Sequence, residues 1–381
     1  MKPSGKNNNY LISIILPVVL YSPLFAFATD SDDSLIPLIT IIKIKQTEKP
    51  LSLPDIKLYT DQSPLNQKLP ADVELEPESS RYVTALTQGT EAMLVQYRQY
   101  SAPVYFSDST TSRTDVLLHC GQTWERGVNV LKNVPIPSFA EPSNDIDGAD
   151  NPIIAGQCGE NSSQDNNMVI IDLQNRCEYD LWQARKETGR WAASWGNAIS
   201  IDSMGVFDTG LSARGSGFAF LAGVIWPHEL ASGVINHALL FALPVGLVKG
   251  GGPVAPATET DGESTNPDAI PEGARLRLDP TLDLNTLNLT PAALTIARAM
   301  QDYGMFLTDR GGSPYLVLYA VDPRSVQGNP YAGYLPDQDF PPIDGIPLDR
   351  LQLVKLPPQD PDFASKLTLP NNGCATFGLE N

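Results

Sequence analysis

Residues 168–201 read MVIIDLQNRCEYDLWQARKETGRWAASWGNAISI, and this stretch decides the fold class. Three runs rich in apolar and β-branched residues, at 168–172, 177–185 and 190–201, are separated by the polar segments LQNR and KETG. Short runs of this kind between turn-forming segments are typical of consecutive antiparallel strands. We therefore expect a three-stranded meander here.

Alternation along the second run divides its side chains between the two faces of the strand. Glu178, Asp180 and Trp182 share one face, while Tyr179 and Gln183 lie on the other. A tryptophan can cover the apolar face of a pyranose, and a neighbouring carboxylate can accept hydroxyl protons or serve as acid or base. This face therefore predicts a sugar site, with a core tryptophan beside a solvated acid as the alternative.

Two further tryptophans extend this candidate site. Trp191 and Trp195 lie on the same side of the third run, although they would equally suit the core of a sandwich. In the sugar-site interpretation Asp180 is catalytic. The expected substrate-binding residues on these strands are Trp182, Gln183, Trp191 and Trp195.

Outside this stretch the chain continues as short apolar runs. These lie at residues 102–106, 116–118, 235–243, 275–278 and 315–321. The 33 prolines among 381 residues exceed the usual share of about 5%, and proline with glycine favours strands joined by turns over long helices. The sequence thus predicts a mainly β fold, an antiparallel β-sandwich or jelly roll with one or two helices and long loops.

One helix is clearly marked between residues 290 and 304. Thr290 can cap its start, Pro291 suits the first turn and Gly304 can end it. Between these signals Ala297 and Met300 belong to an apolar series at helical spacing. We expect this helix to cover one face of a sheet.

The first 28 residues have the pattern of an export signal. Lys2 and Lys6 precede an uncharged apolar run over residues 10–28, which ends Ala-Phe-Ala. A basic start, an apolar middle and a small-x-small end are typical of a cleaved secretory signal peptide. An uncleaved membrane anchor is the alternative, but the run contains two prolines. We expect cleavage near Ala28, a periplasmic or extracellular protein, and no stable membrane span afterwards.

The rest of the chain divides into two parts by composition. Residues 29–80 are rich in Pro, Asp, Ser and Lys and suggest an extended N-terminal arm or linker. Residues 81–381 are expected to form a single β-rich domain with a Pro- and Gly-rich C-terminal tail. The sequence contains no internal repeat and does not indicate an oligomeric state.

The composition excludes several classes of partner. The chain carries 44 acidic against 26 basic residues, a formal charge of −18, and loss of residues 1–28 removes two lysines and makes this −20. Such a chain repels phosphates, so we exclude nucleic acid as a partner and disfavour docking on anionic lipid. A hydrophobic fraction of 42% is ample for a packed core and too high for a disordered chain.

Four cysteines fit an oxidising compartment. Cys120, Cys158, Cys177 and Cys374 are an even number, so two disulfides are expected. Four cysteines allow three pairings. Our first choice is Cys158–Cys177 with Cys120–Cys374, and the Cys120–Cys158 pairing is nearly as favourable. A zinc site is disfavoured because no close C-x2-C pair exists.

Several short blocks resemble a group of secreted bacterial proteins of unassigned function. The blocks, in chain order, are residues 63–66, 69–72, 179–184, 236–239, 256–258, 260–262, 271–275 and 301–304. The resemblance covers most of residues 60–320 and implies no established activity. The similar proteins carry Asp-Gly-His before the Asp-x-Trp-Gln-Ala block, where this chain has Gln-Asp-Asn-Asn at 164–167.

A polar loop between core strands supplies further catalytic candidates. Asp261 and Glu272 flank this loop and could converge with Arg275 on the Asp180 face. Two carboxylates about 5–10 Å apart suit glycoside hydrolysis. A structural salt bridge between Glu272 and Arg275 is the alternative explanation for these residues.

A polysaccharide lyase would use a different set of residues. Arg275 would bind the carboxylate of a uronate, His237 would take the C5 proton, and Tyr303 would protonate the leaving oxygen. His237 lies inside an apolar run, where a buried histidine bonded to a backbone carbonyl is the common alternative. The sequence does not decide between the carboxylates of a hydrolase and the residues of a lyase.

Other chemistries lack their motifs. The chain has no G-x-S-x-G elbow, no G-K-[ST] after its glycine run and no complete EF-hand loop, so we predict no cofactor and no metal site. The best hypothesis is an exported protein that acts on a polysaccharide or cell-envelope glycan as a glycoside hydrolase or polysaccharide lyase. A non-catalytic carbohydrate-binding or structural envelope protein is the alternative, and enzyme and binder are equally well supported.

Overall fold

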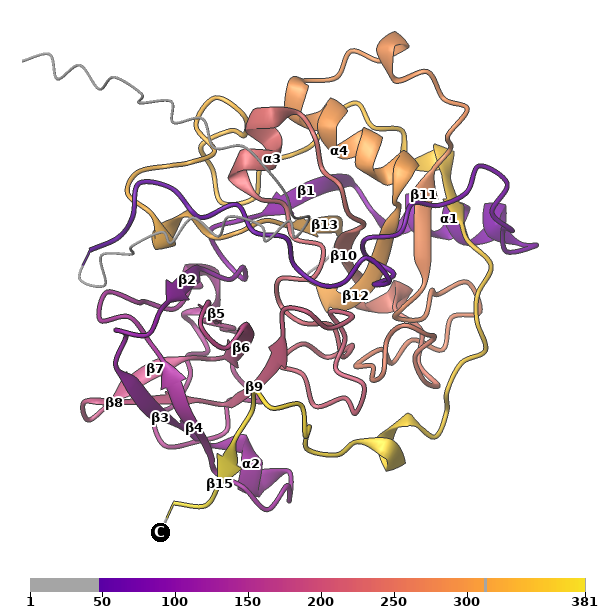
Figure 1. Cartoon of the computed structure of the whole chain (residues 1–381). Helices are drawn as coiled ribbons and strands as arrows, with labels where there is room; N and C mark the ends of the chain where they lie inside the picture. Colours follow the sequence, from indigo (N-terminus) through magenta and orange to yellow (C-terminus); the bar gives the residue numbers. More distant parts are fainter. Residues whose placement is uncertain (1–47, 312–313, 381) are drawn as a thin grey trace, which may run out of the picture. The chain divides into compact units, whose positions relative to one another are not determined.

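The computed structural model describes residues 48–311 and 314–380, which belong to one structural unit (Figure 1). The expected signal peptide, residues 1–28, lies outside the described residues. Within them, no helix is both long and apolar enough to cross a membrane. The two disulfides among the described residues are typical of proteins outside the cytoplasm.

The predicted meander is present, with one modification. Met168–Asp172 (β5), Cys177–Trp182 (β6) and Trp195–Ser200 (β9) are paired antiparallel in the order β5-β6-β9. Between β6 and β9 the chain leaves this sheet as Arg185–Glu187 (β7) and Arg190–Ala193 (β8), which join another sheet. The two longer predicted runs therefore each contribute to two sheets.

Three sheets make up the β structure. The four-stranded sheet has the order β2-β5-β6-β9, the five-stranded sheet β15-β4-β3-β8-β7, and the six-stranded sheet β1-β13-β10-β12-β11-β14. The remaining strands are Ala92–Gln96 (β1), Val104–Ser107 (β2), Arg113–Leu118 (β3), Val130–Pro135 (β4), Leu239–Pro244 (β10), Arg275–Leu278 (β11), Met305–Gly311 (β12), Tyr315–Tyr319 (β13), Leu351–Leu353 (β14) and Phe377–Gly378 (β15).

The prediction of a mainly β fold is confirmed, but the sheets are mixed rather than purely antiparallel. β1 pairs with β13, β10 with β12, β2 with β5 and β3 with β8 in parallel. Parallel neighbours need a long crossover connection, and here most of these partners lie far apart in the chain. The α-helices of the described residues are Ser79–Gly89 (α1), Cys120–Thr123 (α2), Pro227–Ser232 (α3) and Pro291–Asp302 (α4).

The helix expected between residues 290 and 304 is confirmed as α4. The Thr290 hydroxyl accepts a hydrogen bond from the backbone N–H of Ala293 at 3.2 Å, as an N-cap does. Gly304 has φ +71°, which only glycine adopts freely, and it ends the helix. The buried face of α4, which includes Ile296 and Met300, packs on the six-stranded sheet.

The hydrophobic core has three layers. The first lies between the helices α1 and α4 and one face of the six-stranded sheet. The second lies between the other face of that sheet and the four-stranded sheet, and the third between the four- and five-stranded sheets (Figure 1). The four-stranded sheet is therefore covered on both faces, which explains why β5 is buried at every residue.

A β-bulge interrupts the pairing of β10 with β12. Phe241 is paired with Leu307, but the next residue, Ala242, is paired with Asp309, so Thr308 is an extra residue in β12. Without the bulge, alternation along β12 would place Asp309 on the same face as Leu307, toward the first core layer. With the bulge, Asp309 is paired with Ala242, which belongs to the second core layer. The bulge thus directs an acidic side chain toward the four-stranded sheet.

The disulfides correct our first choice of pairing. Cys120 is bonded to Cys158 and Cys177 to Cys374, so Cys158–Cys177 with Cys120–Cys374 is wrong and the second choice is right. Cys177 begins β6, and the C-terminal segment reaches it by adding β15 to the edge of the five-stranded sheet. This bond closes 197 residues, a separation that no local pattern reveals.

Residues 48–78, in the expected N-terminal arm, contain no helix or strand but run along the protein. Tyr59 and Leu65 are buried in the second core layer. The backbone N–H of Tyr59 donates to the carbonyl of Ile201 at 2.6 Å, just beyond β9. This part of the arm therefore contributes side chains to the core.

Candidate functional site

Two carboxyl groups of β6 are buried between the four- and six-stranded sheets. Glu178 accepts hydrogen bonds from the Tyr59 hydroxyl at 2.6 Å and from the backbone N–H of Leu221 at 2.9 Å. Asp180 accepts one from the N–H of Phe220, also at 2.9 Å. Burial raises the pKa of both groups, and for Asp180 the adjacent Glu178 charge raises it further.

These two acids have no exposed surface. A carboxyl group without exposure cannot touch a polymer, so the catalytic role predicted for Asp180 is not available to it in this structure. What Glu178 and Asp180 do is hold the backbone of the loop around residues 220–221. The predicted alternation is nevertheless correct, because Tyr179 and Leu181 lie in the third core layer on the opposite face.

Arg214 is the cation next to these acids. Its side chain is 5% exposed and lies over the ring of Tyr319, with the guanidinium carbon 4.5 Å from the ring centroid. One guanidinium nitrogen lies 3.4 Å from Oδ2 of Asp309, and another donates to the carbonyl of Phe220 at 3.4 Å. A buried arginine needs acids around it, and this one lowers the pKa of Glu178, Asp309 and other nearby groups.

Asp309, which the β-bulge directs inward, is 29% exposed in its side chain. Its Oδ2 accepts a hydrogen bond from the Tyr319 hydroxyl at 3.3 Å. Burial, reinforced by the charge of Asp261, raises the pKa of Asp309 to about 7. Asp309 is thus a carboxyl group held by two donors yet reachable from solvent.

Asp165 is the second partly exposed acidic residue near Arg214. Its Oδ1 accepts a hydrogen bond from the indole Nε1–H of Trp182 at 3.0 Å. Burial raises the pKa of Asp165 to about 7, and Asp309 and Arg214 are both close enough to act on it. The half-buried Trp182 ring therefore lies directly beside an acid that titrates near neutral pH.

The loop that carries Asp165 is held by buried polar groups. The carboxylate of Asp145 accepts the N–H of Asp165 and of Asn166, each at 2.7 Å. Gln183 adopts φ +56°, donates its N–H to the carbonyl of Asp165 at 2.6 Å, and donates its side-chain amide to Gly159 and Gln164. Gln183 is fully buried, so it positions Asp165 rather than contacting a substrate.

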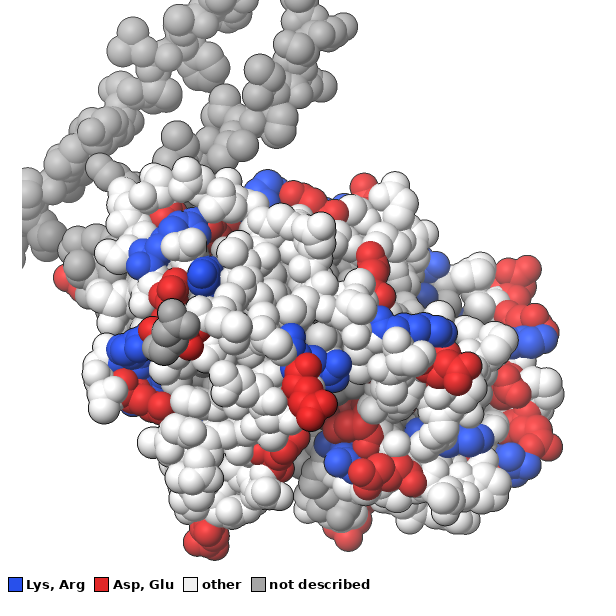
Figure 2. All heavy atoms as spheres, turned by 90° about the horizontal axis from the view of Figure 1, so that it is seen from below, with Lys and Arg blue, Asp and Glu red and all other residues white. Residues whose placement is uncertain are grey.

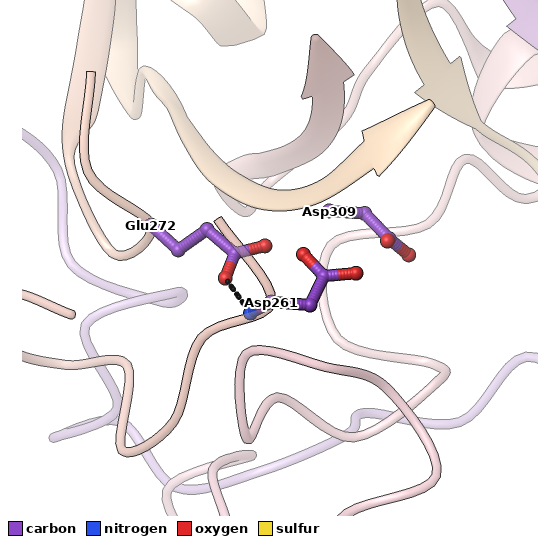
Figure 3. Close-up of side chains that lie close together, drawn as sticks. All are labelled: Asp261, Glu272 and Asp309. Atoms are coloured by element: carbon purple, nitrogen blue, oxygen red, sulfur yellow. Dashed lines mark hydrogen bonds between the residues drawn. The ribbon is translucent and has the colours of Figure 1, made fainter. Parts of the chain in front are cut away.

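Two further carboxyl groups, those of Asp261 and Glu272, lie beside Asp309. Oxygens of Asp261, Glu272 and Asp309 all lie within 4.8 Å of one another (Figure 3). Oε2 of Glu272 accepts the backbone N–H of Asp261 at 3.1 Å, and Arg310 lies 3.2 Å from Oδ2 of Asp261. Burial raises the pKa of Asp261 and Glu272, and the Asp261 charge adds to the effect on Glu272.

We call this group the carboxyl cluster. It consists of Asp165, Glu178, Asp180 and Asp309 near Arg214, together with Asp261 and Glu272, which lie beside Asp309. The structure thus brings Asp261 and Glu272 together, as the polar loop suggested, but with Asp309 in the place expected for Arg275. Glu272 and Arg275 form no salt bridge in the described residues.

The remaining predicted aromatic residues have other surroundings. Trp195 is buried in the third core layer, where its Nε1–H donates to the carbonyl of Leu211 at 2.8 Å. Trp191 lies on β8 of the five-stranded sheet, with the Lys186 ammonium 4.8 Å from its ring centroid. The structure therefore gives Trp195 a core role and separates Trp191 from Trp182 by a change of sheet.

Two residues of the predicted lyase set have partners outside the carboxyl cluster. Nε2 of His237 lies 2.9 Å from Glu229 and its Nδ1 lies 2.9 Å from the carbonyl of Ala238. Arg275 donates to the backbone carbonyls of Tyr303 and Gln67, and burial lowers its pKa to about 10. The third residue, Tyr303, is buried in the second core layer. The contacts of His237 and Arg275 disfavour a lyase mechanism in which these two residues act.

Sequence reasoning missed three members of the site. Asp165 was not singled out within the segment 164–167, and Arg214 lies in an irregular loop. Asp309 is an acid inside the strand Met305–Gly311, and a charge within an otherwise apolar strand is the signal that could have identified it. No signal for their convergence exists in the sequence, because each comes from a different part of the chain.

Comparison of the chain with family models, with curated proteins and with solved structures finds no match. The resemblance to secreted bacterial proteins stays an expectation.

Proposed function

We propose that this protein hydrolyses a polysaccharide outside the cytoplasm, with Asp165 and Asp309 as the two catalytic carboxyl groups. One observation carries the proposal: Asp165 and Asp309 are both partly exposed, both interact with Arg214, and one is bonded to the indole of Trp182. A pair of carboxyl groups beside an aromatic ring is the usual equipment of a glycoside hydrolase.

Burial raises the pKa of both groups to about 7, so at neutral pH the pair can supply one acid and one base. In this proposal Asp165, bonded to the Trp182 indole, donates a proton to the leaving oxygen. Asp309 acts in its ionised form, because Arg214 and the Tyr319 hydroxyl oppose the effect of burial on it. An ionised Asp309 would activate water or stabilise the developing positive charge of the sugar.

Trp182 supplies the binding surface in this proposal. Its ring is half-buried and stacks on Trp124, with ring centroids 6.4 Å apart and an interplanar angle of 14°. In this proposal the exposed part of the ring contacts a pyranose, and the neighbouring indole limits the conformational entropy that the ring loses on binding. The bond from its Nε1–H to Asp165 would keep the acid at a set position beside the bound sugar.

Hydrolysis is favoured over elimination because the histidine and the arginine expected to act in a lyase are engaged in other contacts. The three histidines, His119, His228 and His237, each lie within 3.3 Å of a carboxylate partner. Arg275, which would have bound a uronate, is engaged with backbone carbonyls. The compartment is supported by the two disulfides, and a periplasmic or an extracellular site remains part of the proposal.

The proposal is tested by incubating the purified protein with a panel of neutral and acidic polysaccharides. New reducing ends without the ultraviolet absorbance of an unsaturated uronate are expected. Asp165→Asn and Asp309→Asn should each reduce the rate by about 10²–10⁴-fold, because each removes one proton-transfer group. Asp349→Asn, which changes an exposed acid far from the site in the chain, should leave the rate unchanged.

The other outcomes select other functions. A rise in absorbance together with reducing ends would replace hydrolysis by elimination. No cleavage across the panel, with glycan affinity that Trp182→Ala removes and Asp165→Asn keeps, would identify a carbohydrate-binding protein. Neither cleavage nor affinity would leave a structural envelope protein as the better description.

A further inference from the structure

The face of the carboxyl cluster formed by Asp261, Glu272 and Asp309 has the composition of a metal site. We infer that these three residues bind a calcium ion. Oxygens from all three lie within 4.8 Å of one another. Calcium takes oxygen ligands at about 2.3–2.6 Å, so ligands on opposite sides of the ion are about 4.6–5.2 Å apart, and small side-chain movements would place the three oxygens around one ion.

An unpartnered buried oxygen points to a ligand at this place. Glu272 is 0% exposed, and its Oε1 has no hydrogen-bond partner in the described part of the chain. Oδ1 of Asp261 is buried and unpartnered in the same way. Figure 3 shows this free oxygen of Glu272 directed toward the Asp261 carboxyl group, which lies between those of Glu272 and Asp309. Buried carboxylate oxygens are costly unless a proton or a cation occupies the space between them.

The local charge balance favours a divalent cation. Four carboxylates, those of Asp261, Glu272, Asp309 and the neighbouring Glu263, are bonded to or lie near only two guanidinium groups. Arg310 contacts Asp261 at 3.2 Å and Glu263 at 3.0 Å, and the second group, that of Arg214, lies 3.4 Å from Asp309. Arg214 also acts on Asp165, Glu178 and Asp180, so the carboxyl groups of this region outnumber the guanidinium groups, which favours a bound cation.

The donor set indicates which kind of ion fits. All three side chains offer carboxylate oxygens, which hard cations prefer, and no cysteine or histidine is among them. Asp261 and Glu272 come from irregular segments, which can adjust to the variable geometry of calcium more easily than to the strict octahedron of magnesium. Water would complete the coordination on the exposed side of Asp261 and Asp309.

Calcium binding is separable from the proposed hydrolysis, although the two share Asp309. A bound cation would hold Asp309 ionised, which is the form that the proposed function requires of it. Asp165 is not among the three ligands and would remain free to carry the proton. The inference therefore deepens the proposed function without depending on it.

The experiment measures binding directly on the purified protein after removal of divalent cations. Isothermal titration with CaCl2 at neutral pH should show one site, with a Kd within about 10⁻⁶–10⁻³ M. Thermal unfolding should shift to higher temperature in CaCl2. Glu272→Gln and Asp261→Asn should each weaken binding at least about tenfold, and Glu91→Gln, an exposed carboxylate elsewhere, should bind like the wild type.

Folding of the variants has its own readout. Glu272→Gln removes a buried acid whose neighbours are acidic, so without calcium it should unfold at a temperature equal to or above that of the wild type. Loss of binding in a variant that remains folded then reports the ligand.

Two results would overturn the inference. The first is the absence of both heat and a thermal shift up to about 10 mM CaCl2, which would mean that a proton shared by Asp261 and Glu272 occupies the space instead. The second is equal affinity for MgCl2, which would reject calcium as the specific ligand. If the protein binds calcium but cleaves no glycan, this inference stands and the proposed function is rejected. If the protein cleaves glycan without a divalent cation and binds none, the proposed function stands and this inference is rejected.

Discussion

The Tyr59 hydroxyl and the Glu178 carboxylate lie 2.6 Å apart, although 119 residues separate them in the chain. Glu178 is fully buried, so its two donors, Tyr59 and the N–H of Leu221, replace the water that it has lost. One donor comes from the N-terminal arm and the other from an irregular loop. At the residue scale, buried acids thus attach segments that have no regular secondary structure to the sheets.

Tyr59→Phe tests this attachment. The substitution keeps the ring in the core and leaves Glu178 with one donor fewer, so we expect the free energy of unfolding to fall by about 1–3 kcal/mol. Urea denaturation at neutral pH measures the change. The control is Tyr334→Phe, at a ring that is 37% exposed, which should shift the midpoint little. Equal midpoints for Tyr59→Phe and the wild type would show that the arm is not attached through this bond.

The elements differ in how directly local sequence specifies them. α4 begins with the Thr290 cap and a proline in its first turn, and it is followed by Gly304 with a positive φ, as the sequence predicted. β12, by contrast, carries Asp309 and Arg310 near its end and a bulge at Thr308, and nothing in its pattern predicts that bulge. The regular helix α4 thus packs in the core, whereas the bulged strand β12 positions Asp309 in the candidate site.

Thr290→Ala tests the local signal of α4. Loss of the hydroxyl that accepts the Ala293 N–H should lower stability by about 0.5–2 kcal/mol. Thr290→Ser keeps the acceptor and should restore most of this difference, with both variants compared by urea denaturation. If serine and alanine proved equally destabilising, packing of the threonine methyl group rather than capping would be responsible.

For the whole molecule, the acidic excess has an internal component. On the face shown in Figure 2, basic side chains lie among acidic ones and uncharged atoms cover most of the surface. Several acids are instead buried, among them Glu178, Asp180, Glu272 and Asp322. The formal net charge alone therefore says little about this protein's surface, because several of its acids are buried, where their pKa values are raised.

The buried acids predict how stability depends on pH. Asp165 and Asp322 have folded-state pKa values raised by burial to about 7 and about 6, against an ordinary value of 3.8. Between about pH 4 and pH 7 the folded protein therefore binds more protons than the unfolded chain, and stability falls as pH rises through this window. Without divalent cations, we expect a higher Tm at about pH 5 than at about pH 8.

The control for this pH dependence is a single substitution. Asp165→Asn removes one of the two groups and should make the difference in Tm between the two pH values smaller. Asp349→Asn, at an exposed acid, should leave it as in the wild type. A Tm that is higher at the alkaline value in the wild type would refute the expectation.

Local patterns in the sequence determined the mainly β class, the meander strands β5, β6 and β9, the two faces of β6 and the limits of α4. These features depend on backbone sterics, turn chemistry and the periodicity of apolar residues, all of which act over a few neighbouring residues. The even number of cysteines likewise predicted two disulfides, although not their pairing.

Tertiary structure alone decided the disulfide partners, the burial of Asp180 and the convergence of Asp165, Arg214 and Asp309. It also decided that Asp261 and Glu272 meet Asp309, a juxtaposition that no sequence motif indicates. Such contacts join residues tens to hundreds of positions apart, and they exist only because stacked sheets and a β-bulge close long loops at one place. Periodicity carries no information on which distant segments will meet, so the site follows from the fold.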